Sequence, residues 1–110
     1  MDTYYHADDL GRFAEMGKGN HELWDKFQNY YQAVFAEGAL TEREKALIAL
    51  GVAHAVQCPY CIDAYTQACL EKGSNMEEMT EAVHVACAIR GGASLVHGLQ
   101  MRNVAQKLSM

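Results

Sequence analysis

The 110-residue sequence has few of the features that mark a nucleic-acid-binding, exported or membrane-embedded protein. Its 14 acidic residues outnumber 9 basic ones, its formal net charge is -5, and Lys and Arg form no run. We therefore expect no phosphate-binding surface and no nucleic-acid partner. No apolar run approaches ~18 residues, and the N-terminal segment carries acids where a signal peptide carries basic residues. We expect no membrane partner and a cytoplasmic protein.

Strand signals are also scarce. There is one proline and no sustained alternation of polar and apolar residues, while apolar residues recur at spacings of three and four. This pattern predicts an all-α fold in a single domain spanning residues 1–110, with one core or a core completed by a partner subunit. About six helices are expected, over about 8–16, 21–36, 42–57, 59–72, 76–90 and 93–108.

Short local signals predict where helices begin and end. Thr41 followed by Glu44 matches a capping box, in which each side chain satisfies a free backbone N–H of the other residue. Gly91-Gly92 is expected to interrupt the chain before a last helix. The helix expected over 21–36 carries an aromatic-rich stripe, which is interpreted as core or as a subunit contact.

The stretch Cys58-Pro59-Tyr60-Cys61 is the clearest chemical motif. Pro59 suits the first position of a helix, where its missing N–H costs nothing, so Cys58 is the expected N-cap. Two cysteines at this spacing can form a disulfide, and the positive end of a helix stabilises a thiolate. Such a pair can exchange with another protein or reduce a peroxide through a sulfenic acid that the second cysteine resolves.

Two other interpretations of the pair stay open: half of a zinc site, or two inert buried cysteines. A structural zinc site needs four ligands, and the sequence has no second CxxC and no HxxxH. Cys69, Cys87, His84 and His97 have spacings that match no structural zinc pattern. We expect no metal and no cofactor, and we expect Cys69 and Cys87 to pack as small apolar residues.

Catalysis at neutral pH needs groups that move protons near the sulfurs. His54 lies four residues before Cys58 and can approach the pair as the chain turns. Tyr65 lies one turn after Cys61, where its hydroxyl can donate to a thiolate or a peroxide oxygen. Glu44 can act as a base by orienting His54. Each also has a structural interpretation: a backbone-bonded histidine, a core tyrosine and a capping glutamate.

The segment from Leu40 to Gly98 resembles the core of the carboxymuconolactone decarboxylase and AhpD-like alkylhydroperoxidase family. The shared marks are a buried helix leading into CxxC, a next helix ending in Lys-Gly, an acidic helix start and a Gly-Gly stretch. The resemblance implies an AhpD-like all-α fold that assembles as a trimer or trimer of dimers, with thiol-dependent peroxidase activity. The whole chain is also similar to a narrower branch of small peroxidase-like proteins associated with arsenosugar biosynthesis.

Within that resemblance, Cys61 attacks the peroxide and Cys58 resolves it, whereas the helix dipole alone favours Cys58 as the more acidic thiol. Of the two we favour the assignment that the resemblance implies, because a peroxidase site needs a shaped pocket as well as a thiolate. The sequence departs from the family pattern in two places. Tyr65 stands where a histidine is usual, and Ala46 stands where a glutamate is usual. His54 and Glu44 are hypothesised to replace this proton relay.

The predicted function is a peroxiredoxin-type antioxidant enzyme that uses the Cys58/Cys61 dithiol. Its expected partners are a hydroperoxide or related small oxidised substrate, a thioredoxin-like or dihydrolipoyl reductant, and further copies of the chain. One alternative is the family's lyase chemistry, which calls for cationic or histidine side chains around a dicarboxylate lactone. Another is a non-enzymatic redox sensor or interaction module whose disulfide state alters assembly.

Overall fold

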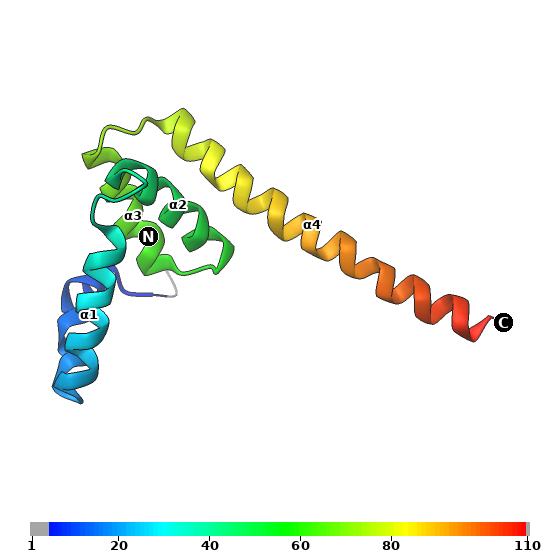
Figure 1. Ribbon diagram of the computed structural model, residues 1–110, viewed down its shortest axis with the longest axis horizontal. Helices are drawn as coiled ribbons and strands as arrows, with labels where there is room; N and C mark the ends of the chain where they lie inside the picture. Colours follow the sequence, from blue (N-terminus) through cyan, green and yellow to red (C-terminus); the bar gives the residue numbers. More distant parts are fainter. Residues whose placement is uncertain (1–4, 110) are drawn as a thin grey trace.

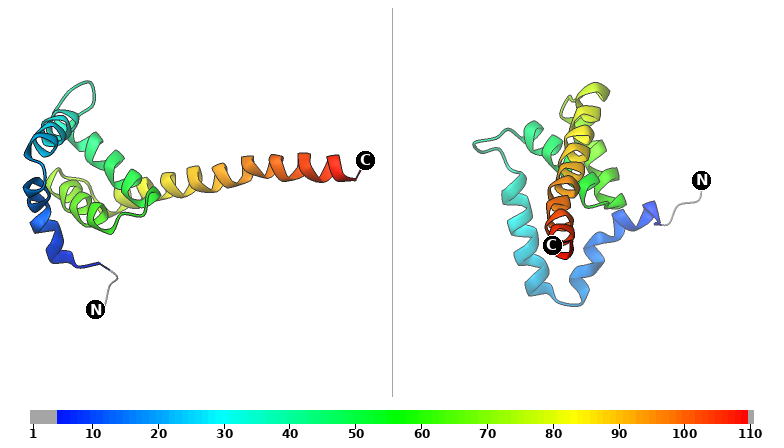
Figure 2. Two further views of the ribbon diagram at one scale, coloured as in Figure 1. Left: turned by 90° about the horizontal axis from the view of Figure 1, so that it is seen from below. Right: turned by 90° about the vertical axis from the view of Figure 1, so that its right-hand side faces the viewer.

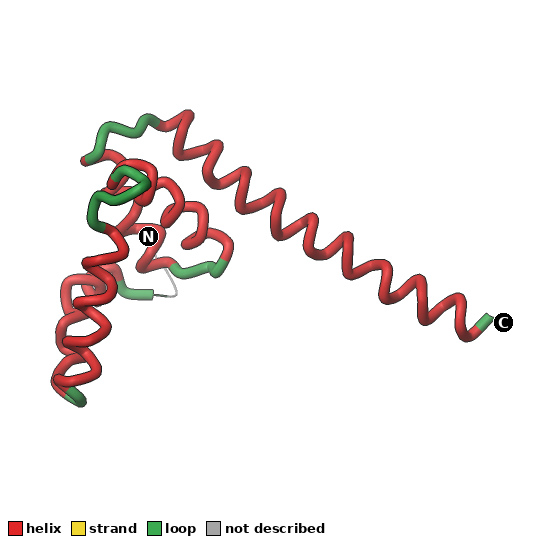
Figure 3. The backbone as a smooth tube through the Cα atoms, in the orientation of Figure 1, coloured by secondary structure: helices red, strands yellow, loops and turns green. Residues whose placement is uncertain are grey.

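The computed structural model describes residues 5–109, in which five helices and no strand are found (Figures 1 and 3). In chain order the helices are the 3-10 helix η1 (Ala7–Lys18), α1 (His21–Phe35), α2 (Glu42–Ala55), α3 (Pro59–Glu71) and α4 (Met76–Leu108). The predicted all-α fold is confirmed. None of these helices is long and apolar enough to cross a membrane.

Helix α2 lies at the centre of the molecule and packs against both α3 and α4. Gly51 allows a close approach of α4, because a Cβ atom at this position would lie 3.3 Å from the carbonyl oxygen of Ala82. An ion pair between Arg43 and Glu78 joins the same two helices. Within residues 5–109 the buried apolar side chains are Ala46, Leu50 and Ala53 of α2, Cys69 of α3, and Met79 and Ala86 of α4.

The predicted capping box forms at the start of α2. The Glu44 N–H donates to Thr41 Oγ1 at 3.0 Å, and the Thr41 N–H donates to Glu44 Oε1 at 2.8 Å. The Thr41 backbone N–H first, and then the Thr41 hydroxyl, hold the pKa of the Glu44 carboxyl below its usual range. After α3, Gly73 adopts a φ of +86°, the left-handed conformation that ends many helices and favours glycine.

The predicted interruption at Gly91-Gly92 is wrong, because α4 continues unbroken through both residues. A glycine inside a helix costs about 1 kcal/mol relative to alanine but keeps its N–H, so the hydrogen-bond ladder survives. The helix has 33 residues and is therefore about 50 Å long. This continuity is why five helices are present in place of the expected six.

The second half of α4 extends away from the other helices (Figures 1 and 2). The radius of gyration is 18.8 Å, whereas a compact domain of this length has about 13 Å. Large apolar side chains lie exposed here, with Leu95 and Leu108 each 82% accessible. Cys87 is also exposed on this helix, so the prediction that it packs as a core residue is wrong for the single chain.

Candidate functional site

The two motif cysteines sit in the first turn of α3, as predicted. Cys58 is the N-cap and Pro59 is the first helical residue. Cys58 Sγ accepts a hydrogen bond from the Cys61 N–H at 3.3 Å, and the two Sγ atoms are 2.8 Å apart. A disulfide bond measures about 2.05 Å, so a small side-chain movement is enough to close the pair.

The turn that leads into Cys58 holds a residue in an uncommon conformation. Gln57 has a φ of +57°, which costs a residue with a side chain about 1 to 2 kcal/mol. Two backbone hydrogen bonds hold the turn: the Gln57 N–H donates to the His54 carbonyl at 3.2 Å, and the Cys58 N–H donates to the Ala53 carbonyl at 3.0 Å. Strain held in this way is typical of functional sites.

The two thiols are unequal acids. The hydrogen bond between the two thiols is the main cause that lowers the pKa of Cys58, and the N–H groups of Cys61 and Tyr60 add to it against the effect of burial. Burial first, and then the hydrogen bond and charge of Cys58, raise the pKa of Cys61 to about 11. Cys58 Sγ also accepts the Cys61 backbone N–H, which favours its ionised form. Cys58 is therefore the more acidic thiol of the pair.

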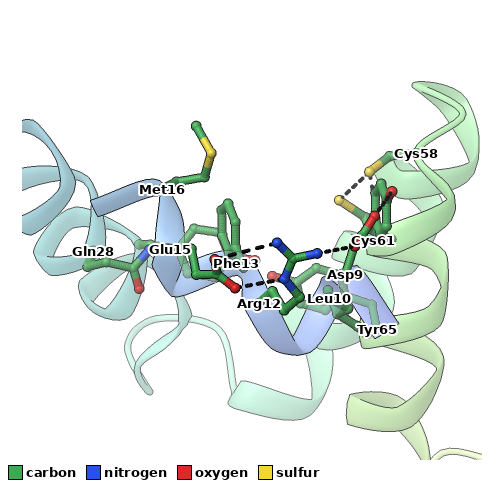
Figure 4. A pocket seen from close by; sticks show the side chains of 13 residues that line it. Asp9, Leu10, Arg12, Phe13, Glu15, Met16, Gln28, Cys58, Cys61 and Tyr65 are labelled. Carbon is green, nitrogen blue, oxygen red and sulfur yellow. Dashed lines mark hydrogen bonds and ion pairs between the residues drawn. The ribbon is translucent and has the colours of Figure 1, made fainter. Parts of the chain in front are cut away.

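A pocket of about 850 Å³ opens beside the pair, between η1, α1 and α3. Figure 4 shows Arg12 of η1 between Glu15 and Asp9, with the two cysteines across the pocket on α3. The Arg12 guanidinium lies 2.7 Å from Glu15 and 3.3 Å from Asp9, so the cation of the lining is neutralised. The lining residues are Asp9, Leu10, Arg12, Phe13, Glu15, Met16, Gln28, Tyr31, Cys58, Tyr60, Cys61, Ala64 and Tyr65.

Tyr60, inside the CPYC motif, joins α3 to η1. Its hydroxyl donates to Asp9 Oδ2 at 3.3 Å, and its ring meets the Tyr5 ring edge to face with centroids 5.0 Å apart. Burial first, and then the charge of Asp9, raise the pKa of Tyr60, so its phenol stays protonated at neutral pH. No local signal predicts this contact, because Asp9 and Tyr60 are 51 residues apart in the sequence.

Helix α1 supplies an aromatic wall. The Tyr31 and Phe35 ring centroids are 4.9 Å apart, and Phe35 stacks on Tyr65 at 5.3 Å. Tyr31, Cys61 and Tyr65 also line a second pocket of about 390 Å³ between α1 and α2. The aromatic stripe of this helix forms no core within the chain, because no residue of α1 is fully buried.

The structure brings together three of the five predicted site residues, namely Cys58, Cys61 and Tyr65. His54 and Glu44 lie outside the lining of the pocket. His54 Nδ1 is 2.8 Å from the Leu50 carbonyl oxygen, and Glu44 is engaged in its cap. The relay through these two residues stays a prediction, with no contact to either sulfur in this structure.

Metal ligands are not gathered in the part of the chain that the structure describes, where no three His, Cys, Asp or Glu side chains could hold an ion. The zinc interpretation therefore has no ligand set among residues 5–109. Cys69 is 0% exposed in the core, which confirms that it packs as a small apolar residue. Cys58 and Cys61 are only half-buried and line the pocket, unlike a pair of inert core cysteines.

Comparison with known proteins places this scaffold in a family. The sequence profile of the carboxymuconolactone decarboxylase family matches residues 22–101. The chain is 39% identical over 84 residues to a Paracoccus denitrificans protein named uncharacterized protein 4 in cox locus, covering 76% of each chain.

Two solved structures are similar along most of their length. A protein from Methanobacterium thermoautotrophicum has a TM-score of 0.74 at 36% identity, over 76% of this chain and 94% of that one. A carboxymuconolactone decarboxylase family protein from Legionella pneumophila, in its apo form, has a TM-score of 0.69 at 31% identity, over 94% and 92% of the two chains. Profile, sequence and structure agree, and the chain belongs to the carboxymuconolactone decarboxylase family.

Proposed function

We propose that this protein is a thiol-dependent, peroxidase-like oxidoreductase in which Cys58 and Cys61 cycle between dithiol and disulfide. The observation that carries the proposal is a sulfur pair 2.8 Å apart, unequal in acidity, in the wall of a large pocket. A thiolate is the nucleophile in peroxide reduction and in disulfide exchange, and Cys58 is the more acidic of the two thiols. A cytoplasmic setting, where thiols are kept reduced, fits this use of the pair.

The proposed cycle begins with Cys58, which reverses the roles that the family resemblance implies. The Cys58 thiolate attacks the terminal oxygen of a hydroperoxide, the O–O bond breaks, and an alcohol and a Cys58 sulfenic acid are formed. The sulfur of Cys61 then displaces the hydroxyl group and closes the disulfide. A thioredoxin-like or dihydrolipoyl dithiol restores the reduced pair by exchange.

The pocket supports an organic hydroperoxide as substrate. Its volume of about 850 Å³ lies in the range of sites that bind small organic molecules, and aromatic side chains form much of its wall. Lyase chemistry on a dicarboxylate lactone would need free cationic or histidine groups. Among the described residues that line the pocket, Arg12 is the cation, it is paired with Asp9 and Glu15, and no histidine is present.

A turnover assay tests this proposal. Purified protein would be supplied with cumene hydroperoxide or hydrogen peroxide and with either dihydrolipoamide or reduced thioredoxin, and peroxide loss would be followed. We expect faster consumption of the organic peroxide, and loss of turnover in Cys58→Ser and in Cys61→Ser. Cys87→Ser is the matched control, because this exposed thiol lies outside the pocket lining and its loss leaves turnover unchanged.

Two results would contradict the proposal. Turnover that persists in both motif variants would remove the dithiol from the reaction. A wild-type protein that forms the disulfide but consumes no excess peroxide would favour the redox-sensor alternative.

We further propose that the working form is a homo-oligomer, a trimer or a trimer of dimers. The accessible surface is 8647 Å², whereas a compact monomer of 12.2 kDa exposes about 6100 Å². Much of the excess lies on α4, whose second half is rich in exposed apolar side chains. Mass measurement in solution tests this proposal, and a stable monomer at micromolar concentration would contradict it.

A further inference from the structure

The proposed reaction leaves the pocket short of a proton source. Breaking the O–O bond of an alkyl hydroperoxide releases an alkoxide, which is a strong base and a poor leaving group unless it is protonated. His54 bonds to a backbone carbonyl and Glu44 caps α2, and neither lines the pocket. Asp9 and Glu15 do line it, but both accept hydrogen bonds from Arg12. Besides the Cys61 thiol, the candidate donors are therefore the remaining polar side chains of the lining.

Three phenols line the pocket together with the cysteines: Tyr31, Tyr60 and Tyr65. The hydroxyl of Tyr60 already donates to Asp9. Tyr65 packs against the buried core and stacks on Phe35, which gives it a structural task. The hydroxyl of Tyr31 has no hydrogen-bond partner among the described residues, so it is free to donate to a ligand.

The ring of Tyr31 is also held in place, and the charges of both cysteines affect its hydroxyl. Its ring lies between Phe27 and Phe35, with centroid distances of 5.6 and 4.9 Å, which restricts its movement. It lines the pocket shared with both cysteines and, with Cys61, the smaller pocket between α1 and α2. Burial first, and then the charges of Cys61 and Cys58, raise the pKa of Tyr31, so the phenol is protonated at neutral pH.

We propose that Tyr31 is the general acid of the peroxide-cleaving step, an inference that rests on the proposed peroxidase function. The Cys58 thiolate attacks the terminal oxygen, its electron pair forms the S–O bond, and the O–O bond breaks toward the alkoxide. The Tyr31 hydroxyl gives its proton to this alkoxide, which leaves as the alcohol. The products of the step are the Cys58 sulfenic acid and the Tyr31 phenolate.

The same residue then serves the second step as a base. The Tyr31 phenolate accepts the proton of the Cys61 thiol, and the resulting thiolate attacks the sulfur of Cys58. The S–S bond forms while the S–O bond breaks and releases hydroxide. Two sulfur atoms are oxidised by one electron each and the peroxide is reduced by two, so electrons balance and Tyr31 returns to its starting state.

A leaving-group comparison tests the role of Tyr31. The variant Tyr31→Phe keeps the ring between Phe27 and Phe35 and removes only the hydroxyl. Single-turnover thiol loss would be measured with tert-butyl hydroperoxide, whose alkoxide needs a proton, and with peracetic acid, whose carboxylate does not. We expect about a 100-fold loss of rate with the alkyl peroxide and less than about a 3-fold loss with the peracid.

Two control variants test whether the selective loss of rate belongs to Tyr31 alone. Tyr30→Phe removes the hydroxyl of the neighbouring exposed tyrosine and leaves both rates unchanged. Tyr65→Phe lowers both rates by the same factor, because it changes a wall of the pocket and not the proton donor. Iodoacetamide alkylation of Cys58 in Tyr31→Phe should match that of the wild type, which shows that the thiolate is intact.

Three results would overturn the inference. Equal losses with the two peroxides in Tyr31→Phe would make Tyr31 a positioning residue, and a selective loss in Tyr65→Phe would assign the acid to that residue. An active wild type with an unaffected Tyr31→Phe would remove Tyr31 alone from the reaction. A wild type that reacts with neither peroxide would overturn the proposed function and this role together.

Discussion

The first turn of α3 and the second half of α4 are opposite kinds of structure. In the α3 turn, Cys58 finds its partners within three residues: the Cys61 N–H, the Cys61 thiol and the fixed geometry of Pro59. In the second half of α4, apolar side chains such as Leu95 and Leu108 stand in solvent. The first is complete within one chain, whereas the second extends away from the other helices.

The difference separates two sources of stability. A capped helix turn is specified by local hydrogen bonds, each contributing about 1 kcal/mol. A long helix is stabilised mostly by packing of an apolar face, and the exposed second half of α4 lacks that source of stability within the single chain. Substitutions in the core or in a capped turn should therefore change the free energy of unfolding more than matched substitutions in the second half of α4.

The largest expected effect is the difference in reactivity between the two cysteines. On a Cys87→Ser background, Cys61→Ser should leave Cys58 reacting quickly with iodoacetamide, because the N–H groups of residue 61 and Tyr60 remain and the serine hydroxyl replaces the thiol as hydrogen-bond donor. Cys58→Ser should leave Cys61 about 100-fold slower at pH 7, because burial, the main cause of its raised pKa, is retained.

The pH dependence of iodoacetamide alkylation shows the direction in which the pKa of each cysteine is shifted. A lowered pKa means that the Cys58 thiolate persists below about pH 8.5, the ordinary midpoint of cysteine, and is lost only as the pH falls further. The midpoint for Cys61 should lie well above that value. Equal midpoints would contradict the asymmetry of the pair.

The second prediction compares two apolar residues of the same helix, α4. Met79 is 6% exposed and packs in the core, so Met79→Ala should lower the free energy of unfolding by about 2 to 4 kcal/mol. Leu95 is 82% exposed, so Leu95→Ala should change monomer stability by less than about 0.5 kcal/mol but weaken self-association. Denaturant unfolding and sedimentation measure the two quantities. Equal losses of stability under monomeric conditions would show that the second half of α4 folds back onto the chain.

The third prediction compares two helical glycines. A Cβ atom added at Gly91 would meet nothing within 4 Å in the single chain, so Gly91→Ala should raise the free energy of unfolding by about 1 kcal/mol. Gly51→Ala should gain less or destabilise, because the new Cβ would lie 3.3 Å from the Ala82 carbonyl oxygen. Equal gains in thermal unfolding would contradict the close packing of α2 on α4.

The smallest expected effect concerns the strained residue before the motif. Gln57→Gly should raise the free energy of unfolding by about 0.5 kcal/mol, because glycine adopts a positive φ without steric cost but loses more entropy on folding. Gln67→Gly in the exposed face of α3 is the control and should lower stability. A destabilising Gln57→Gly would show that the turn is not strained.

The parts of the fold that the sequence predicts are those with local causes. The capping box of Thr41 and Glu44 and the position of Cys58 as N-cap both follow from hydrogen bonds between near neighbours. The expected break at Gly91-Gly92 fails for a related reason: glycine weakens a helix, but nothing in that segment removes a hydrogen bond. Propensity alone does not decide whether a long helix continues.

The candidate site is predicted in part for the same reason. Cys58, Cys61 and Tyr65 lie on one helix, so their spacing places them together. Other helices supply Tyr31, Asp9 and Arg12, and no helical spacing in the sequence links these residues to the dithiol. His54 is near the dithiol in sequence, but the carbonyl of Leu50 holds its Nδ1.

The most direct test of the account counts thiols in a single turnover. Reduced protein on a Cys87→Ser background would receive one equivalent of cumene hydroperoxide, and free thiols and the Cys58–Cys61 peptide mass would be measured over time. We predict rapid loss of two thiols per chain and a disulfide between Cys58 and Cys61, with one alcohol formed per disulfide. Both thiols remaining free while the peroxide persists would contradict it.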